Sequence, residues 1–224
     1  MTQLHNAIVF DLDDTLYKEV DYVKSGFNAV AGYISEKENL NQKDLYGSLI
    51  EHFEQGGNTF ENLIDTYGLS YSIFELLEVY RTHTPKLDLD SNTNDLLNNL
   101  KKDSAYLGLL TDGRSNQQRN KIKALGLNKY FNGIVISEEF GSKKPSEKNF
   151  KYFMKIANEK YKYYYIGDNT KKDFIAPNKL GWETICLRDN GLNIHQQNFN
   201  LDSSFLPKYM INNLAEIVKI VNDE

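Results

Sequence analysis

Short apolar runs recur along the chain, and each of them ends in a polar or glycine-containing loop. They lie at residues 7–10, 106–110, 133–136, 163–166 and 184–187. Runs of this kind are typical of strands buried in a parallel sheet. Amphipathic patterns between and after the later runs predict helices, at residues 116–125, 146–157, 173–180 and 211–221. The alternation predicts an α/β fold, a doubly wound parallel sheet of Rossmann-like form with helices on both faces.

Residues 18–95 break this alternation, because they carry helical patterns and no convincing strand pattern. The helical patterns lie at residues 20–36, 43–55, 59–67 and 71–83. We therefore expect residues 18–95 to form a helical module inserted after the first strand. Residues 1–17 and 96–224 would then form the α/β core. Ligands of open parallel sheets bind beyond the carboxyl ends of the strands, so an insert at this point would cover the site as a lid.

The first apolar run stops at an acid, Asp11, which is followed by Asp13 and by the hydroxyl of Thr15. Two ionised carboxylates about 4 Å apart repel each other by roughly 4 kcal/mol at an effective dielectric constant of 20. A bound cation or a shared proton would relieve this repulsion. A strand end with a solvated acidic turn is the alternative, and the other strand ends decide between the two.

Polar side chains also follow the later strands, and the ends of parallel strands converge at one edge of a sheet. These residues are Thr111, Asp112 and Gly113 after the second run, and Asp168 and Asp173 after the fourth. Lys144, fixed by the neighbouring Pro145, precedes the fourth run. Several oxygen ligands suit Mg²⁺, which binds through a few carboxylates and a substrate phosphate. The lysine and the hydroxyl suit phosphate oxygens, one carboxylate can attack phosphorus, and another can transfer the proton.

Taken in order, these residues resemble the four motifs of the haloacid dehalogenase superfamily, in its phosphatase branch. The helical insert resembles the type I cap domain of that superfamily. The motifs are matched by Asp11, Asp13 and Thr15, then by Thr111, then by Lys144, and last by Gly167, Asp168 and Asp173. Residues 111–131 further resemble acylneuraminate 9-phosphatases and house-cleaning nucleotidases, at Gln118, Arg119, Lys121, Ile122, Tyr130 and Phe131. Asp112 departs from the asparagine usual at its position in that branch.

The resemblance implies a separate role for each acid. Asp11 would attack phosphorus, and Asp13 would act as general acid and then as general base. Asp11, Asp13 (through its backbone carbonyl) and Asp168 would bind Mg²⁺, and Asp173 would support the metal site from behind.

The resemblance also implies the residues that hold the substrate phosphate. Thr111 and Lys144 would bind phosphate oxygens, and Asp112 and Gly113 would complete this part of the site. The adjacent Lys143 is an alternative to Lys144, but the position before proline favours Lys144.

The chemistry expected is the hydrolysis of a small-molecule phosphomonoester, either a sugar phosphate or a nucleoside monophosphate. Asp13 argues against a dehalogenase, because displacing halide from carbon requires no acid for an alcohol leaving group. A phosphomutase needs the same core and stays open. A receiver-type phosphate-binding module is the main alternative that is not an enzyme. Such modules are about half this length, however, and lack a large helical insert.

The composition of the chain indicates which classes of partner to expect and where in the cell the protein would act. The chain has 224 residues and a net charge of −5, so we do not expect it to bind nucleic acid. A single cysteine, Cys186, is expected to be a buried apolar residue of a cytoplasmic protein. Residues 1–6 are polar and lead directly into the first strand, which argues against a signal peptide, and no apolar run is long enough to span a membrane. The pattern leaves open whether the chain is a monomer or a homodimer.

Two further sets of side chains are expected to be structural. The tyrosines at 163–165 would lie on alternate faces of one strand. The histidines show no spacing typical of a metal pair and are expected at the surface, at positions 5, 52, 83 and 195.

Overall fold

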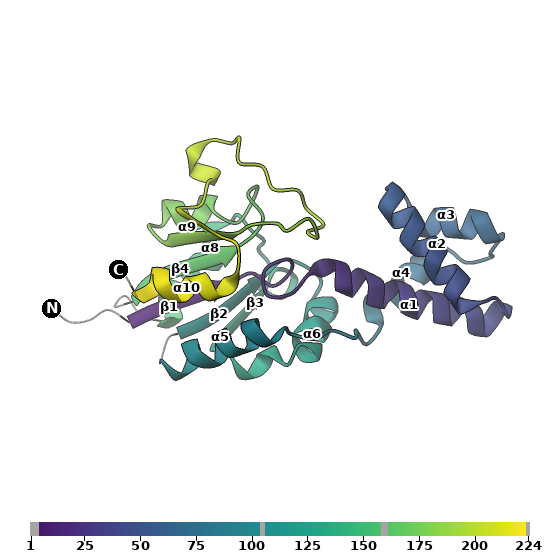
Figure 1. The fold of residues 1–224 in the computed structure, drawn as a ribbon, viewed down its shortest axis with the longest axis horizontal. Coiled ribbons are helices and arrows are strands. Elements are labelled where there is room, and N and C mark those ends of the chain that lie inside the picture. Colours follow the sequence, from purple (N-terminus) through teal and green to yellow (C-terminus); the bar gives the residue numbers. More distant parts are fainter. Residues whose placement is uncertain (1–4, 104–105, 158–160, 223–224) are drawn as a thin grey trace. The chain divides into compact units, whose positions relative to one another are not determined.

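The computed structural model describes residues 5–103, 106–157 and 161–222. The chain divides into two compact units, one formed by Met1–Glu19 with Asp88–Glu224 and the other by Val20–Leu87 (Figure 1). The first unit is an α/β domain and the second is entirely helical. No helix among the described residues has the length and apolar character needed to cross a membrane.

The α/β unit is built on a parallel sheet of six strands in the order β3-β2-β1-β4-β5-β6. Its strands are β1 (His5–Phe10), β2 (Tyr106–Thr111), β3 (Gly133–Ile136), β4 (Tyr161–Gly167), β5 (Glu183–Leu187) and β6 (Tyr209–Ile211). The first five confirm the strands predicted from the apolar runs. All six run in the same direction, so their carboxyl ends share one edge of the sheet.

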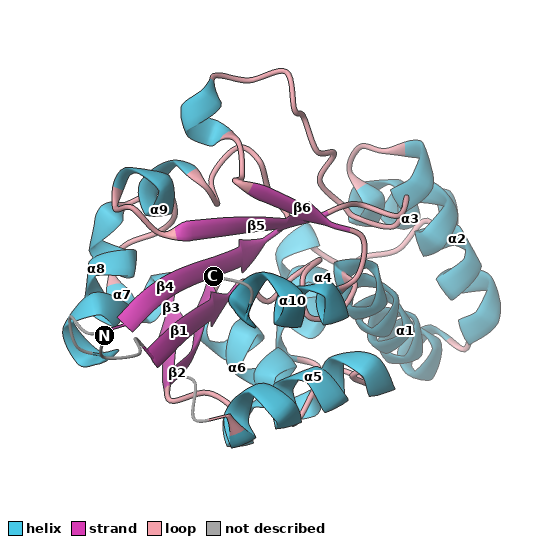
Figure 2. Cartoon of the chain, turned by 60° about the vertical axis from the view of Figure 1, so that its left-hand side comes forward, coloured by secondary structure: helices cyan, strands magenta, loops and turns pink. Residues whose placement is uncertain are grey.

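Helices cover both faces of this sheet. They are α5 (Ser91–Lys102), α6 (Ser115–Ala124), α7 (Ser137–Phe140), α8 (Glu147–Ala157), α9 (Ile175–Lys179) and α10 (Ile217–Asn222). Short 3-10 turns occupy Leu127–Lys129, Ser203–Phe205 and Leu214–Glu216. Figure 2 shows α8 and α9 on one face, with α5 and α10 on the other. The predicted doubly wound architecture is therefore confirmed.

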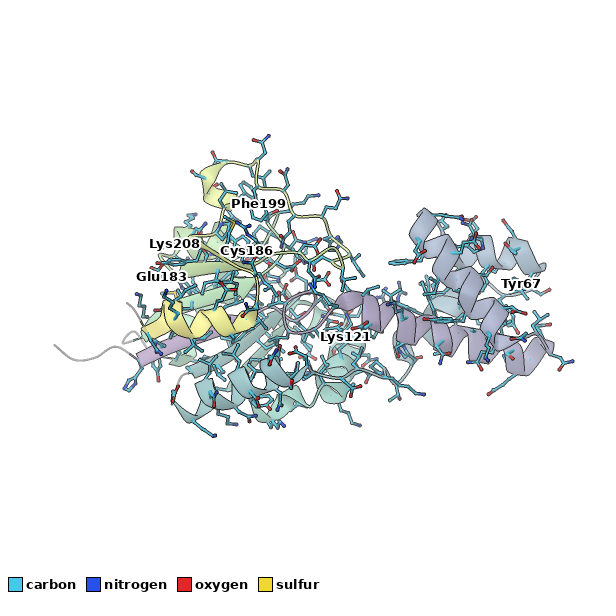
Figure 3. All side chains as sticks on the ribbon, viewed as in Figure 1. Tyr67, Lys121, Glu183, Cys186, Phe199 and Lys208 are labelled. Carbon is cyan, nitrogen blue, oxygen red and sulfur yellow. The ribbon has the colours of Figure 1, made fainter. Side chains whose placement is uncertain are left out.

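Aromatic side chains fill the core between the sheet and α8. Tyr163 and Tyr165 of β4 point to this face and belong to one apolar cluster with Phe150 and Trp182. The Tyr163 and Trp182 rings stack with their centroids 4.9 Å apart. The predicted burial of Cys186, a residue of β5, is confirmed, and Figure 3 labels its position.

The register of the strands brings the ends of distant segments together. Phe10 of β1 lies opposite Ile166 of β4, so Asp11 and Asp168 follow two adjacent strands at the same edge. The Asp11 amide extends the pairing by donating a hydrogen bond of 2.8 Å to the Ile166 carbonyl. On the other side of β1, Phe10 lies opposite Leu109 of β2, two residues before Thr111.

The helical unit has its own core. It contains α2 (Gln42–Gln55), α3 (Thr59–Tyr67), α4 (Ile73–Thr82) and all but the first residue of α1 (Glu19–Glu38). The side chains of Asn41 and Ser72 cap the amino ends of α2 and α4. The ring of Phe27 packs at right angles against Phe53 and Phe60, and Tyr80 closes the cluster. These contacts explain why the segment folds as a separate unit.

The helix predicted over residues 211–221 begins later in the structure than the sequence pattern indicated, so this prediction is wrong for its first residues. Ile211 lies in β6 and pairs with Leu187 of β5. A 3-10 turn at Leu214–Glu216 follows, and α10 begins only at Ile217. Asn213 and Glu216 form a capping box at this turn, which sets a fresh helix start after the strand. The pattern also did not predict α5, which begins after the N-cap Asp90.

Candidate active site

A buried lysine lies at the centre of the site and contacts two acids. The Lys144 Nζ atom is 2.8 Å from Asp11 Oδ2 and 2.8 Å from Asp173 Oδ1. It also donates to the hydroxyl of Tyr165 at 3.0 Å. Lys144 is 2% exposed and Asp11 is 5% exposed, so these charges interact with little screening by water. The neighbouring Lys143 is exposed, and the structure therefore brings Lys144 to the predicted nucleophile.

Three carboxylates gather beside this lysine. Asp11, Asp168 and Asp173 each place a carboxylate oxygen within 4.8 Å of the others. Both oxygens of Asp173 already accept hydrogen bonds, because Oδ1 faces Lys144 and Oδ2 accepts from the amides of Asp168 and Asn169. Asp168 Oδ2 accepts from the amide group of Asn193 at 2.9 Å. The arrangement suits Asp11 and Asp168 as ligands of a hard cation, with Asp173 supporting them from behind.

The proton affinities of these acids reflect their crowding. Burial raises the pKa of Asp11 to about 6, with Lys144 opposing the shift and Asp173 adding to it. Burial, reinforced by the charges of Asp173 and Asp11, raises the pKa of Asp168 to about 9. A divalent cation between the carboxylates would offset this repulsion and favour their ionised forms. The donor set therefore fits a cation such as Mg²⁺.

Asp13 turns toward a different set of partners from those of Asp11. Its Oδ1 atom accepts hydrogen bonds from Lys121 Nζ at 2.7 Å and from the Tyr17 hydroxyl at 2.5 Å. Its Oδ2 atom accepts from Gln118 Nε2 at 2.8 Å. Burial opposes ionisation, but Lys121, Tyr17 and Gln118 together lower the pKa of the Asp13 carboxyl below its ordinary value. The two acids of the first motif thus lie in contrasting environments.

The end of β2 contributes the predicted phosphate-binding segment. Thr111 is 1% exposed, and its Oγ1 atom accepts a hydrogen bond from Gln118. Asp112 accepts from the Lys144 amide at 3.1 Å and pairs with Lys172 at 3.3 Å. Asp112 thus fixes the lysine-bearing loop. The amide of Gly113 donates to Ser137 Oγ, and Gly113 does not line the cavity beside the acids.

Thr15, the hydroxyl of the first motif, is buried at 3% exposure. Its Oγ1 atom has no hydrogen-bond partner among the described residues. Asp14 adopts a positive φ of 55° and accepts hydrogen bonds from the amides of Glu19 and Ile194. The turn after β1 is therefore held from both sides.

A long loop between β5 and β6 contacts Asp168 and borders the site. Asn193 bonds the Asp168 carboxylate, and the Gln197 amide group donates to the Asp168 carbonyl at 2.9 Å. Lys18 donates to Asn193 at 2.6 Å and joins this loop to the turn after β1. His195 lies between these anchored positions, and its exposed side chain lines the site. It fits the predicted surface location, but its place at the site was not predicted.

A cavity of about 110 Å³ opens between these elements. Every residue that lines it is polar: Asp11, Asp13, Asp14, Glu19, Thr111, Asp112, Asp168, Asn169, Lys172 and His195. Of the predicted site residues, Asp11, Asp13, Thr111, Asp112 and Asp168 line this cavity. Lys144 and Asp173 lie behind Asp11, within its hydrogen-bonded network.

Comparison with known proteins identifies the family. A family model described as haloacid dehalogenase-like hydrolase matches residues 8–187, which span β1 through β5. The chain belongs to the haloacid dehalogenase-like hydrolases. The expected family is thereby confirmed, and the match includes every predicted motif.

Several curated relatives are named phosphatases. A glyceraldehyde 3-phosphate phosphatase of Methanocaldococcus jannaschii is 27% identical over 97% of this chain and 97% of its own length. A second, from Methanopyrus kandleri, is 26% identical with the same coverage. A pyrimidine 5'-nucleotidase of Escherichia coli is 28% identical, but over only 53% of this chain and 50% of its own.

Solved structures of haloacid dehalogenase-like proteins share the fold. An HAD phosphatase from Thermococcus onnurineus superposes with a TM-score of 0.63 at 23% identity, covering 98% of this chain and 99% of that one. A magnesium-bound structure of YfnB from Bacillus subtilis gives 0.68 at 22% identity, covering 98% of this chain and all of that one.

Several side chains of the site were not predicted to act there. Tyr165 was expected only to pack, yet its hydroxyl contacts Lys144. Gln118 and Lys121 entered only through a resemblance, and the structure places both on Asp13. The sequence did offer a signal, because Gln118 and Lys121 lie on the same face of this polar helix as the apolar Ile122. That spacing places both polar side chains toward the core. Lys172 and Asn193 gave no signal in the sequence.

Proposed function

We propose that this hydrolase is a Mg²⁺-dependent phosphomonoesterase that forms an aspartyl phosphate on Asp11. The observation that carries the proposal is the separation of two acids of one motif. Asp11 contacts Lys144 beside two further carboxylates, whereas Asp13 is held by Lys121 and Gln118. A nucleophile and an acid–base group are thereby available in one small polar cavity.

The proposed reaction begins with attack of an Asp11 carboxylate oxygen on phosphorus. Asp13 must carry a proton for this step, and the negative charge of the bound phosphate favours that proton against the lowering effect of Lys121. The bond between phosphorus and the ester oxygen breaks, and Asp13 gives its proton to the departing alcohol. Asp13, now ionised, then takes a proton from water as that water attacks phosphorus and breaks the bond to Asp11. Inorganic phosphate leaves, and both carboxyl groups return to their starting states.

Other residues bind and orient in this scheme. Lys144 is assigned to the phosphoryl group that Asp11 receives, because its ammonium already lies on that carboxylate. Thr111 supplies a hydroxyl from the adjacent strand end. Asp11, Asp168 and the Asp13 carbonyl would hold Mg²⁺, with Asp173 behind them. When bound, the cation would neutralise phosphate charge and orient the phosphoryl group for in-line transfer.

Two substrate classes fit this reaction, and a small sugar phosphate is favoured over a nucleoside monophosphate. Two relatives that match nearly the whole chain are named glyceraldehyde 3-phosphate phosphatases. The cavity at the strand ends is small and lined by polar side chains, as suits a short hydroxylated ester. A nucleoside monophosphate is the second candidate, because one relative over half the chain is a pyrimidine 5'-nucleotidase. In either case residues 18–95 would act as a cap domain that contributes substrate specificity.

A substrate panel tests this function. Triose, tetrose and hexose phosphates, nucleoside monophosphates and an aryl phosphate would be assayed with Mg²⁺ and with EDTA. Phosphate release that needs Mg²⁺ and is fastest with short sugar phosphates is expected. Equal rates with EDTA, or no release from any ester, would contradict the proposal. Isomerisation of a sugar phosphate without net release would instead indicate a phosphomutase.

A further inference from the structure

Two buried polar residues on α6 contact Asp13 but take no chemical step in the proposed reaction. Gln118 is 2% exposed and Lys121 is 1% exposed, and they lie one helical turn apart. Figure 3 labels Lys121 close to the segment that follows β1. Burying a lysine and an amide costs free energy unless both are paired, so their partners indicate what they do.

Both residues hold the carboxylate of Asp13, each from a different side. Lys121 Nζ lies 2.7 Å from Asp13 Oδ1 and 3.4 Å from Glu19 Oε1. Gln118 Nε2 lies 2.8 Å from Asp13 Oδ2, 2.5 Å from Thr111 Oγ1 and 3.2 Å from the Asp112 carbonyl. Gln118 therefore joins the acid of the first strand end to the hydroxyl of the second.

The contacts distinguish the two oxygens of Asp13. A carboxylate has about four acceptor sites, two on each oxygen. Oδ1 accepts from both Lys121 and the Tyr17 hydroxyl, whereas Oδ2 accepts from Gln118 alone among the described residues. The Asp13 side chain keeps 17% of its surface exposed, against 2% for that of Lys121. Oδ2 is thus the oxygen with room to carry a proton.

We propose that Gln118 and Lys121 are positioning residues that orient Asp13, so that its Oδ2 atom exchanges the proton with the leaving alcohol and with water. The inference rests on the proposed phosphatase function. It goes beyond that function by assigning the acid–base step to a three-residue unit anchored on α6. A helix holds a side chain more firmly than a loop does, and a misplacement of about 1 Å can cost about 100-fold in rate.

The test uses the basicity of the leaving group. Alkyl phosphates release an alkoxide that must be protonated, whereas 4-nitrophenyl phosphate releases a weakly basic phenolate that needs little help. The ratio kcat/KM covers steps up to aspartyl phosphate formation, so hydrolysis of that intermediate does not enter it. The variants are Lys121→Met, Lys121→Arg and Gln118→Met in the full chain, with Lys123→Met as the matched control. Lys123 is an exposed lysine on the same helix.

The expected result is a selective loss. Lys121→Met and Gln118→Met should lower kcat/KM for a sugar phosphate by about 10- to 100-fold, and for 4-nitrophenyl phosphate by less than about threefold. Lys121→Arg should recover part of the loss because it retains a cationic donor, and Lys123→Met should match the wild type.

Equal losses on the two esters, or none, would overturn the inference and leave a structural role for both residues. Should Lys121→Met fail to fold by circular dichroism, Lys121→Arg and Gln118→Met still carry the comparison. A failure of the proposed function is distinguishable, because the wild-type chain would then release phosphate from neither ester in the presence of Mg²⁺.

Discussion

The ammonium of Lys144 lies 2.8 Å from a carboxylate oxygen of Asp11 and 2.8 Å from one of Asp173. One buried cation thus serves two acids that follow different strands. Removing one charge from a buried ion pair leaves its partner buried without a counter-charge. The free-energy cost of that is larger than the stability that the intact pair contributes.

Replacing Lys144 by methionine is therefore expected to affect both stability and turnover. The free energy of unfolding should fall by roughly 3–5 kcal/mol, because Asp11 and Asp173 lose their counter-charge. Phosphatase activity should fall by at least about 100-fold, since phosphoryl charge loses a fixed cation. Urea unfolding and steady-state kinetics measure the two effects. Lys143→Met is the control, because it removes an exposed neighbouring charge and should change neither stability nor activity. If Lys143→Met lowered activity and Lys144→Met did not, Lys144 would be excluded from the site.

The hydroxyl of Tyr165 is expected to hold the Lys144 ammonium in position. Tyr165→Phe removes the acceptor 3.0 Å from Lys144 Nζ and should cost about 1 kcal/mol of stability. A severalfold fall in kcat should accompany it. Tyr163→Phe is the control, because the Tyr163 hydroxyl donates to the Met154 carbonyl, away from the acids. If both variants keep full activity, Tyr165 has only a packing role.

The crowded acids predict how stability depends on pH and Mg²⁺. Burial raises the pKa of Asp11 to about 6 and that of Asp168 to about 9, from an ordinary value of 3.8. The folded chain then holds these protons more tightly than the unfolded chain. Asp11 therefore destabilises the metal-free fold as pH rises from about 4 to about 6, and Asp168 does so from about 4 to about 9. Mg²⁺ favours the ionised carboxylates and should reverse this loss.

The increase in unfolding temperature on adding Mg²⁺ should accordingly be larger near pH 8 than near pH 5. Differential scanning fluorimetry with Mg²⁺ or EDTA measures it. Asp168→Asn should raise the unfolding temperature of the metal-free protein at pH 8 and abolish most of the Mg²⁺ effect. A Mg²⁺ effect that is independent of pH, or unchanged in Asp168→Asn, would place the cation elsewhere.

His195 gives a prediction for substrate binding. Its exposed imidazole lines the cavity, on a loop anchored by Asn193 and Gln197 to Asp168. His195→Ala should raise KM for sugar phosphates severalfold and leave 4-nitrophenyl phosphate turnover within about twofold. Gln196→Ala, an exposed neighbour on the same loop, is the control. Unchanged KM values for all esters would show that His195 does not contact the substrate.

The strands and their acids could be predicted from the sequence because both depend on short-range patterns. An apolar run that ends in Asp11 indicates a strand and its carboxyl end, and parallel pairing then brings Asp168 next to it. The hydroxyl of Tyr165 follows the same strand, but its contact with Lys144 depends on the loop that carries the lysine. No periodicity along β4 encodes that contact.

The carboxyl-terminal region shows the opposite case. The apolar positions from Ile211 to Val221 fit a helix, yet they are divided among a strand of three residues, a turn and α10. The pairing of Ile211 with Leu187 outweighs local helical preference. The loop that brings Asn193 and Gln197 to Asp168 has no repeating pattern at all, so its part in the site depends on tertiary hydrogen bonds alone.

The covalent step on Asp11 can be observed directly by trapping the protein during turnover. The chain would be mixed with Mg²⁺ and a phosphoester, quenched in acid within milliseconds, reduced with borohydride and digested for mass spectrometry. Borohydride converts aspartyl phosphate to homoserine, so homoserine is expected at position 11 in the wild type and at no position in Asp11→Asn, which should also be inactive. Steady turnover without homoserine at position 11, or turnover retained by Asp11→Asn, would contradict the assignment of Asp11 as the nucleophile.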